Sequence, residues 1–339
     1  MTFLIAVVML GLIIFVHELG HFLTAKLFKM PVSEFSIGMG PQVFSVDTKN
    51  TAYSFRAIPI GGYVNIEGME VGSEVENGFS SKPAYQRFVV LFAGVFMNFL
   101  MAFILLFAVA KINGRIEYDT NAIIGGLVKG GANEQILKVD DKILELDGKK
   151  INVWTDISKI TKSSQNKEEI SALIERNGKE ENITLKLTKD EENNRVVLGI
   201  SPKYKKINLS ATESLDFAKN SFNSIFTDTL KGFFTLFSGK ASLKEISGPV
   251  GIFKVVGEVS KFGWVSIISL CVVLSINIGV LNLLPIPALD GGRILFVLLE
   301  LFGIKVNKKW EEKLHKGGMI LLLFFILMIS VNDVWKLFN

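Results

Sequence analysis

Long apolar runs, separated by polar stretches, dominate the pattern along this chain. Four of them, at residues 3–28, 88–110, 264–284 and 317–338, are each close to the roughly 20 residues that a helix needs to cross a bilayer. A shorter apolar stretch at 293–302 includes a glutamate and is too short to span, so it predicts an interfacial or partly inserted helix. The pattern predicts a polytopic α-helical membrane protein with about four transmembrane helices.

Two polar stretches between these runs have β-like patterns. Residues 31–64 alternate polar and apolar positions around a turn at 47–50, which predicts a β-hairpin with strands near 42–46 and 52–58. Residues 111–206 are polar and rich in Lys and Glu, and they predict a small soluble mixed α/β domain. Its short β-like runs are 123–128, 142–146, 170–175, 183–187 and 196–200.

The segment after this domain has the periodicity of a helix. A capping box from Ser210 to Glu213 precedes apolar residues at helical spacing up to Phe237. This predicts an amphipathic helix that lies on the membrane or against the transmembrane bundle. Packing onto the soluble domain is the alternative.

The composition is typical of a membrane protein and argues against nucleic acid as a binding partner. Of 339 residues, 49% are hydrophobic and 27 are Phe, while the net charge of +4 gives no basis for nucleic-acid binding. One cysteine, Cys271, excludes a disulfide within the chain. The first apolar run lacks a basic start and a small-residue cleavage site, so we interpret it as a retained span rather than a signal peptide.

The first apolar run contains the sequence His17-Glu18-Leu19-Gly20-His21. On a helix, positions 17 and 21 face the same way, so two imidazoles can converge on one zinc ion while Glu18 holds the reacting water. Ionisable groups inside a membrane cost roughly 2.5–3.5 kcal/mol each on insertion scales, so they usually mark function. The alternative is a polar pair that is hydrogen-bonded within the bundle.

A zinc site needs a third protein ligand, and Asp290 is the best candidate. Prolines at 285 and 287 break the third run just before it, and helix-length counting gives it the same depth as His17. His315 lies in a Lys-rich connector and is expected to be solvated, whereas Cys271 would lie near the outer end of its span. The alternative role for Asp290 is a helix N-cap.

The distribution of positive charge predicts the orientation in the membrane. The connectors at 29–87 and 293–316 carry many Lys and Arg residues and, by span parity, share one side of the membrane. The positive-inside rule assigns that side to the cytoplasm of the cell. The N-terminus, the soluble domain and the C-terminus are then extracytoplasmic, with the metal site toward the cytoplasmic side.

These motifs together resemble the site-2 protease family of intramembrane zinc metalloproteases. The resemblance rests on HELGH at 17–21 and NLLPIPALDGG at 282–292, and it is closest to the bacterial branch with one PDZ domain. It departs from the usual pattern at Val95, Gly131, Ile136 and Asp140, where proline or glycine is common. Four further segments support it: 61–64 (GGYV), 87–98 (RFVVLFAGVFMN), 248–252 (GPVGI) and the PDZ-like core at 130–148.

The resemblance implies a domain organisation. Residues 1–110 would form the first part of the membrane protease core, with a membrane-associated β-hairpin at about 31–64. Residues 111–206 would form an extracytoplasmic PDZ-like domain. The amphipathic helix and connector would occupy 207–262, and the second part of the membrane core would occupy 263–339.

The resemblance also implies chemistry. Zn²⁺ would be held by His17, His21 and Asp290, with Glu18 as the general base. Substrates would be membrane-spanning segments of single-pass proteins, such as trimmed anti-sigma factors or remnant signal peptides. Candidate substrate-binding residues are Asn277, Asn282, Gly61, Gly62, Tyr53 and Phe55, and the candidate PDZ peptide loop is Leu198, Gly199 and Ile200.

Two other functions fit the same motifs. One is a non-catalytic membrane adaptor that docks partners through the PDZ domain and has a structural metal site. The other is a prenyl-protein-type integral metalloprotease, which would draw its third ligand from a downstream helical glutamate. The physiological substrate and the oligomeric state are not encoded in these patterns.

Overall fold

The computed structural model divides the chain into two compact units, Met1–Ala110 with Ala211–Asn339, and Lys111–Ser210. It describes residues 2–338 except 70–74, 119–120, 129, 165, 191–194, 239–247 and 305. Each unit is described by itself below.

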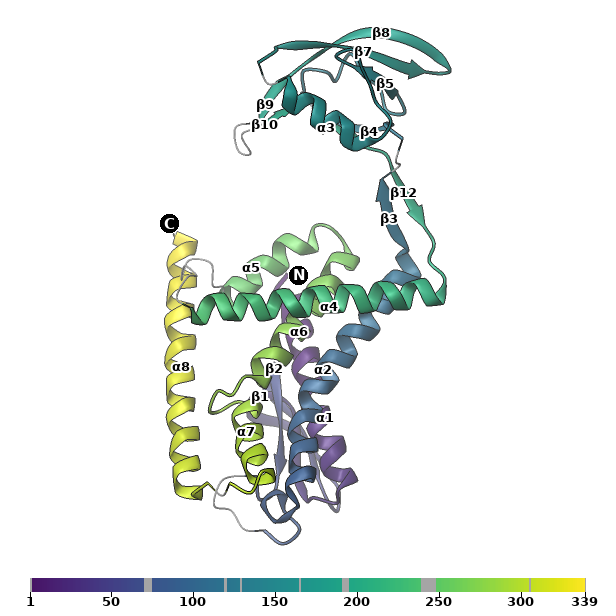
Figure 1. Cartoon of the computed structure of the whole chain (residues 1–339). Helices are drawn as coiled ribbons and strands as arrows, with labels where there is room; N and C mark the ends of the chain where they lie inside the picture. The colour runs from purple at the N-terminus through teal and green to yellow at the C-terminus, as the bar shows by residue number, and fades with distance from the viewer. Residues whose placement is uncertain are drawn as a thin grey trace. The chain divides into compact units, whose positions relative to one another are not determined.

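Four helices of the first unit are long and apolar enough to cross a membrane, among the residues described. They are α1 (Thr2–Leu27), α2 (Ala84–Asn113), α6 (Trp264–Leu283) and α8 (Lys308–Phe338) (Figure 1). The last begins before the predicted apolar run at 317 because the preceding Lys-rich segment is also helical. There Glu312 and Lys316 form an ion pair one turn apart, with Oε1 and Nζ 2.6 Å from each other.

Three further α-helices are described in this unit: α4 (Ala211–Phe237), α5 (Pro249–Ser260) and α7 (Asp290–Leu301). The apolar face of α4 packs against α2 and α6, where the ring of Phe99 meets those of Phe222 and Phe226 with centroids 5.7 Å away in each case. The amphipathic segment therefore lies against the bundle, as one of the sequence alternatives predicted. Helix α5 was not predicted, although Pro249 at its first turn is a common start signal.

The predicted hairpin is present, but it is longer than expected and folds back on itself. Its strands are β1 (Val32–Asp47) and β2 (Ala52–Ile66). Phe35 pairs with both Tyr53 and Val64, so the first part of β1 lies between the two halves of β2. Within this hairpin, the segments 42–47 and 62–66 each pair along one side only. A short 3-10 helix, Phe79–Ser81, precedes α2.

The second unit is a small α/β domain with one helix, α3 (Trp154–Ser163), among its described residues. Its core contains the buried side chains of Ile143, Leu146, Ile174 and Leu185. The main sheet has the order β6 (Lys149–Lys150), β5 (Lys142–Leu146), β7 (Glu169–Arg176) and β8 (Lys179–Lys186). The remaining pairs are β3 (Arg115–Tyr118) with β12 (Tyr204–Ile207), β4 (Ile124–Leu127) with β11 (Ile200–Pro202), and β9 (Thr188–Asp190) with β10 (Arg195–Val197).

Candidate metal centre

Two histidines of α1 and the first residue of α7 converge inside the first unit. Nε2 of His17 lies 3.0 Å from Oδ2 of Asp290, and Nε2 of His21 lies 3.3 Å from the same oxygen. The two Nε2 atoms are 3.2 Å apart. Both histidines are buried, and Asp290 is largely buried. Among the described residues, these three form the group of His, Cys, Asp or Glu side chains that could hold a metal ion.

The spacing of these three atoms fits a tetrahedral zinc site. Bonds of about 2.0–2.1 Å to zinc imply ligand-to-ligand edges of about 3.3 Å. The three observed separations run from 3.0 to 3.3 Å. Two imidazole nitrogens and one carboxylate oxygen are common zinc donors, and three protein ligands leave a fourth position for water or substrate.

Neighbouring groups orient both rings for metal binding. The Nδ1–H of His21 donates to the backbone carbonyl of Val90 at 2.8 Å, which leaves the Nε2 lone pair free. Nδ1 of His17 lies 3.4 Å from Nδ2 of Asn98, whose buried Oδ1 has no partner. If the amide is turned over, Oδ1 accepts the His17 Nδ1–H, which satisfies both groups in the metal-binding tautomer.

Glycines let α1 and α2 approach closely at this level. A Cβ at Gly94 would stand 2.4 Å from Nε2 of His21 and 2.8 Å from Cε1 of His17. A Cβ at Gly20 would stand 2.3 Å from the carbonyl oxygen of Ala93. The two imidazoles therefore occupy space that any side chain at position 94 would fill.

A sharp turn delivers Asp290 to the histidines. The N-cap of α7 is Leu289, and Asp290 is the first helical residue, so its carboxylate does not serve as the N-cap. A Cβ at Gly291 would stand 2.2 Å from the carbonyl oxygen of Leu284, and one at Gly292 would stand 2.4 Å from that of Ile286. The turn therefore requires glycine at both positions. The break predicted from the two prolines is present in this turn.

A cavity of about 440 Å³ opens beside the three candidate ligands. Glu18 lines it and is half-buried, and its carboxylate accepts a hydrogen bond from the backbone of Val64. Asn282, one of the predicted substrate-binding residues, also lines this cavity. Arg293 contributes a cationic side chain, and its Nη1 donates to the carbonyl of Met69 at 3.1 Å.

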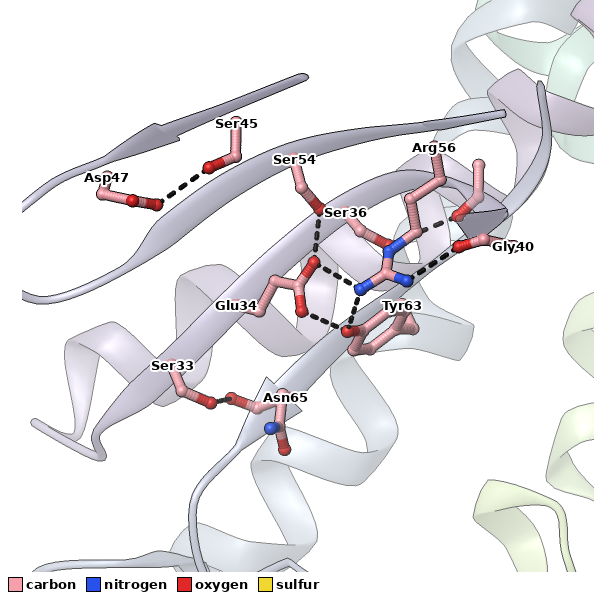
Figure 2. A network of polar contacts seen from close by, with 11 residues as sticks. Ser33, Glu34, Ser36, Gly40, Ser45, Asp47, Ser54, Arg56, Tyr63 and Asn65 are labelled. Atoms are coloured by element: carbon pink, nitrogen blue, oxygen red, sulfur yellow. Dashed lines mark hydrogen bonds and ion pairs between the residues drawn. The ribbon is translucent and has the colours of Figure 1, made fainter. Parts of the chain in front are cut away.

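The folded-back hairpin borders the cavity through Tyr63 and Val64. Figure 2 shows the polar cluster that ties this edge to the rest of the hairpin. Glu34 accepts hydrogen bonds from Ser54, from Nη2 of Arg56 at 2.8 Å and from the hydroxyl of Tyr63. Nη2 of Arg56 also donates to the Tyr63 hydroxyl at 2.7 Å, and Nη1 donates to the carbonyl of Gly40 at 2.9 Å.

The hydrogen bonds around Glu34 change its acidity. Partial burial alone would raise the pKa of this carboxyl group, but the bonds from Ser54, Tyr63 and Arg56 outweigh burial and hold the pKa below its usual value. The same cluster raises the pKa of Tyr63, through burial and through the neighbouring carboxylate. Glu34 is therefore the charged partner that fixes Arg56 and Tyr63 on this face.

Other predicted substrate-binding residues lie away from the metal cavity. Oδ1 of Asn277 accepts a hydrogen bond from Thr229 of α4 at 2.6 Å, and Asn277 lines a second, mainly apolar cavity of about 380 Å³. Tyr53 and Phe55 lie in the inner half of β2, where the Tyr53 ring contacts Phe35 with centroids 6.4 Å apart. Substrate binding by Asn277, Tyr53 and Phe55 stays a prediction.

The predicted glycines and the residues of the candidate PDZ loop are described by their backbone contacts and burial. Gly61 has a φ of +87° at the bend between the two halves of β2, and a Cβ at Gly62 would stand 2.6 Å from the carbonyl oxygen of Ser36. In the second unit, Leu198 is buried in the core, Gly199 accepts from the backbone N–H of Val128 at 2.9 Å, and Ile200 begins β11.

The two alternative third ligands do not reach the cluster. Cys271 is buried in a separate apolar cluster with Ala6 and Ile13. The expectation that His315 is solvated was wrong: it is only 8% exposed, because the Lys-rich segment continues α8 and turns this side chain toward α7. Its ring packs against Phe296 with centroids 5.6 Å apart.

Three contributors to the site were missed in the sequence. Asn98 and Gly94 belong to the recognised 87–98 segment, but neither had been given a role. The Val90 carbonyl is a backbone group that no side-chain pattern reveals. A polar residue such as Asn98 inside an apolar run was the available signal, since such residues are costly unless they have a partner.

The chain is similar to known peptidases over most of its length. Residues 5–325 match peptidase family M50. A Fusobacterium nucleatum protein, named as a zinc metalloprotease, is 92% identical over the full length of both chains. The regulator of sigma-W protease RasP of Bacillus subtilis is 27% identical, with 99% of each chain covered.

A solved structure was also found, the PDZ domain of an SdrC-like protein from Listeria monocytogenes. It is 16% identical to this chain, covers 25% of it and 90% of that domain, and has a TM-score of 0.23. The family match, in contrast, extends over nearly the whole sequence and includes the motifs at 17–21 and 282–292. It covers two of the four apolar helices completely and the larger part of α1 and α8. The chain belongs to peptidase family M50, the site-2 protease family, and is a zinc-dependent metalloprotease of the membrane.

Proposed function

We propose that this protease cleaves membrane-spanning segments of single-pass proteins at a zinc site formed by His17, His21 and Asp290. The observation that carries the proposal is the convergence of three donor atoms within 4.8 Å of one another, contributed by helices α1 and α7. The cavity beside them supports it, because it leaves room for substrate next to an open metal position.

Glu18 is the proposed general base and acid. It follows His17 on the same helix and lines the same cavity, so it can take a proton from the attacking water and give it to the leaving amine nitrogen. The chemistry that a bound zinc ion supplies is polarisation of the scissile carbonyl and greater acidity of that water. Val90 and Asn98 keep the two imidazoles in position for this work.

A helical substrate must unwind before its amide bonds become accessible. The segment 62–66 is an edge of the folded-back hairpin, and two of its residues line the cavity. An unwound substrate can pair with this edge as an added strand. Asn282 is then the side chain in the cavity that we assign to substrate backbone binding. Tyr53 and Phe55, which the sequence suggested for substrate binding, are each paired on both sides.

The remaining features extend the proposal to the whole chain. We assign the N-terminus, the PDZ-like unit and the C-terminus to the extracytoplasmic side, on the basis of the positive charge of the opposite connectors. The PDZ-like unit would restrict entry to trimmed substrates. Anti-sigma factors and remnant signal peptides are the proposed classes, with the regulator of sigma-W protease as the supporting relative.

Two variants of the purified chain test this function. Glu18→Gln should keep zinc and lose cleavage of a membrane peptide, because it removes the base without removing a ligand. Asp290→Asn should lose both zinc binding and cleavage, because it removes the negative charge that offsets Zn²⁺. A non-catalytic adaptor would keep partner docking in Glu18→Gln and would not cleave the membrane peptide even as the wild type. Normal zinc content and cleavage in Asp290→Asn would contradict the proposed ligand set.

A further inference from the structure

Helix α8 contacts the turn that carries Asp290 through one buried side chain. The backbone N–H of Ala288 donates to Nδ1 of His315 at 3.1 Å. One helical turn further along, Gly318 lies so close to Pro287 that a Cβ there would stand 2.4 Å from the Cβ of Pro287. The turn is therefore held against α8 at two neighbouring residues, immediately before the proposed third ligand.

This turn has a conformation that needs support. Ala288 has a φ of +82°, in the left-handed region that residues with a Cβ rarely adopt. The N–H of Ala288 donates to His315 and does not take part in a helix or sheet hydrogen-bond pattern. Strained residues persist where the surroundings hold them, and Ala288 itself lines the metal cavity.

The contact uses one defined atom of the imidazole. Because Nδ1 accepts the Ala288 N–H, the ring proton lies on Nε2, which is buried and has no partner. His315 does not line the metal cavity, so its influence on the site passes through the turn. The opposite end of α8 has its own anchor, since Asp333 accepts the Gly251 N–H at 2.8 Å. Loss of the His315 contact would thus release the turn without detaching the helix.

We propose that His315 is a positioning residue, whose Nδ1 fixes the turn at Ala288 and thereby sets where the Asp290 carboxylate meets His17 and His21. The proposal rests on the proposed function, because it takes Asp290 as the third ligand. It assigns to α8 a role in metal affinity that a lipid-facing span would not have.

Two substitutions of similar size separate the two ring nitrogens. In His315→Asn, the side-chain oxygen can occupy the place of Nδ1 and accept the Ala288 N–H. In His315→Gln, the longer side chain carries its polar atoms to the place of Nε2. Full-length protein in detergent would be titrated with zinc against a competing chelator, and kcat and KM for a membrane peptide would be measured at fixed free zinc. Lys313→Leu, an exposed change on the same helix, is the control.

We expect His315→Gln to weaken zinc binding by about 10–100-fold, as loss of a supporting partner typically does, and His315→Asn to remain near wild type. At limiting zinc, kcat should fall in His315→Gln while KM stays unchanged, because the cavity lining is intact. Adding Ala288→Gly should recover part of the lost affinity, since glycine adopts the turn without strain.

Three outcomes would overturn the proposal. They are wild-type zinc affinity in both variants, equal loss in both, and loss in His315→Asn with retention in His315→Gln. Asp290→Asn is measured in parallel: if it keeps zinc, the proposed ligand set fails. If it loses zinc while both His315 variants bind normally, only the positioning role of His315 fails.

Discussion

Gly94 of α2 lies directly against His21 of α1, at a point where any Cβ would come within 2.4 Å of Nε2, the nitrogen that we propose as a zinc ligand. The contact is part of a close approach between two apolar helices, of the kind that small residues permit in membranes. It means that the metal centre depends on a residue with no functional group of its own.

Gly94→Ala should therefore disrupt the candidate metal centre, although it adds only one methyl group. The added Cβ must displace His21 or separate the two helices, so we expect zinc affinity to fall by about tenfold or more, and cleavage to fall with it. Gly232→Ala on α4 is the matched control, because a Cβ there meets nothing within 4 Å. Metal analysis of both purified variants gives the answer, and equal zinc content would contradict the packing argument.

Asn98 should influence zinc binding through His17. Asn98→Leu removes the group facing Nδ1 of His17 and should lower zinc affinity by about 10–100-fold. Asn98→Asp keeps an acceptor for the Nδ1–H and should bind zinc more tightly than Asn98→Leu. Chelator competition measures both, and indistinguishable affinities in the two variants would show that this amide does not orient the ring.

The grouping of His17, His21 and Asp290 could be predicted from the sequence because its geometry is local. His17 and His21 are one helical turn apart, and the prolines at 285 and 287 indicated a helix break before Asp290. Burial of His315 could not be predicted in the same way. It depends on where α8 begins and on which turn packs against it, and the dense lysines around it suggested a solvated segment instead.

The strand pairing within the hairpin also could not be predicted in full from the sequence. Alternation predicted two strands, but it could not show that Phe35 pairs with both Tyr53 and Val64. That fold-back depends on the bend near Gly61, whose φ is +87°, and on a polar cluster assembled from three separate segments. The sequence suggested Tyr53 and Phe55 of the inner strand, together with Gly61 and Gly62, for substrate binding. In the structure, Tyr63 and Val64 of the hairpin line the cavity.

The cluster around Glu34 should make the hairpin sensitive to acid. Since the folded-state pKa of Glu34 is lowered, its stabilising contribution is complete above the ordinary glutamate pKa of about 4.3 and is lost as the pH falls through the folded value. Hydrogen exchange of hairpin amides should rise in this window. Glu34→Gln should remove the pH dependence and loosen the hairpin at neutral pH, whereas Asp47→Asn should change neither. An unchanged acid response in Glu34→Gln would contradict the assignment.

The proposed orientation predicts which cysteines an impermeant reagent reaches in intact cells. With buried Cys271 replaced by serine, a cysteine at Lys167 of the PDZ-like unit should be labelled, and one at Lys308 should be labelled only after the membrane is opened. The charge of the 293–316 connector is the physical basis. The reverse pattern would invert the topology and would move the metal centre to the other side.

The hairpin edge at Val64 borders the cavity beside Glu18. The backbone N–H of Val64 donates to the Glu18 carboxylate at the border of the cavity. Proline at position 64 removes this donor, and proline is tolerated at sheet edges. Val64→Pro should keep zinc and lose cleavage by about tenfold or more, the cost of a hydrogen bond to a charged group being about 1.5–3 kcal/mol. Val64→Ala keeps the N–H and should cleave normally.

A proline at Tyr53 would behave differently, because Tyr53 pairs with both Phe35 and Val46 in the interior of the hairpin. Tyr53→Pro should therefore lower the amount of folded protein, not only its turnover. Measuring zinc content, hairpin hydrogen exchange and cleavage in all three variants separates the edge from the interior. If Val64→Pro cleaves a membrane peptide at the wild-type rate, neither the Glu18 contact nor strand addition at this edge contributes to the reaction.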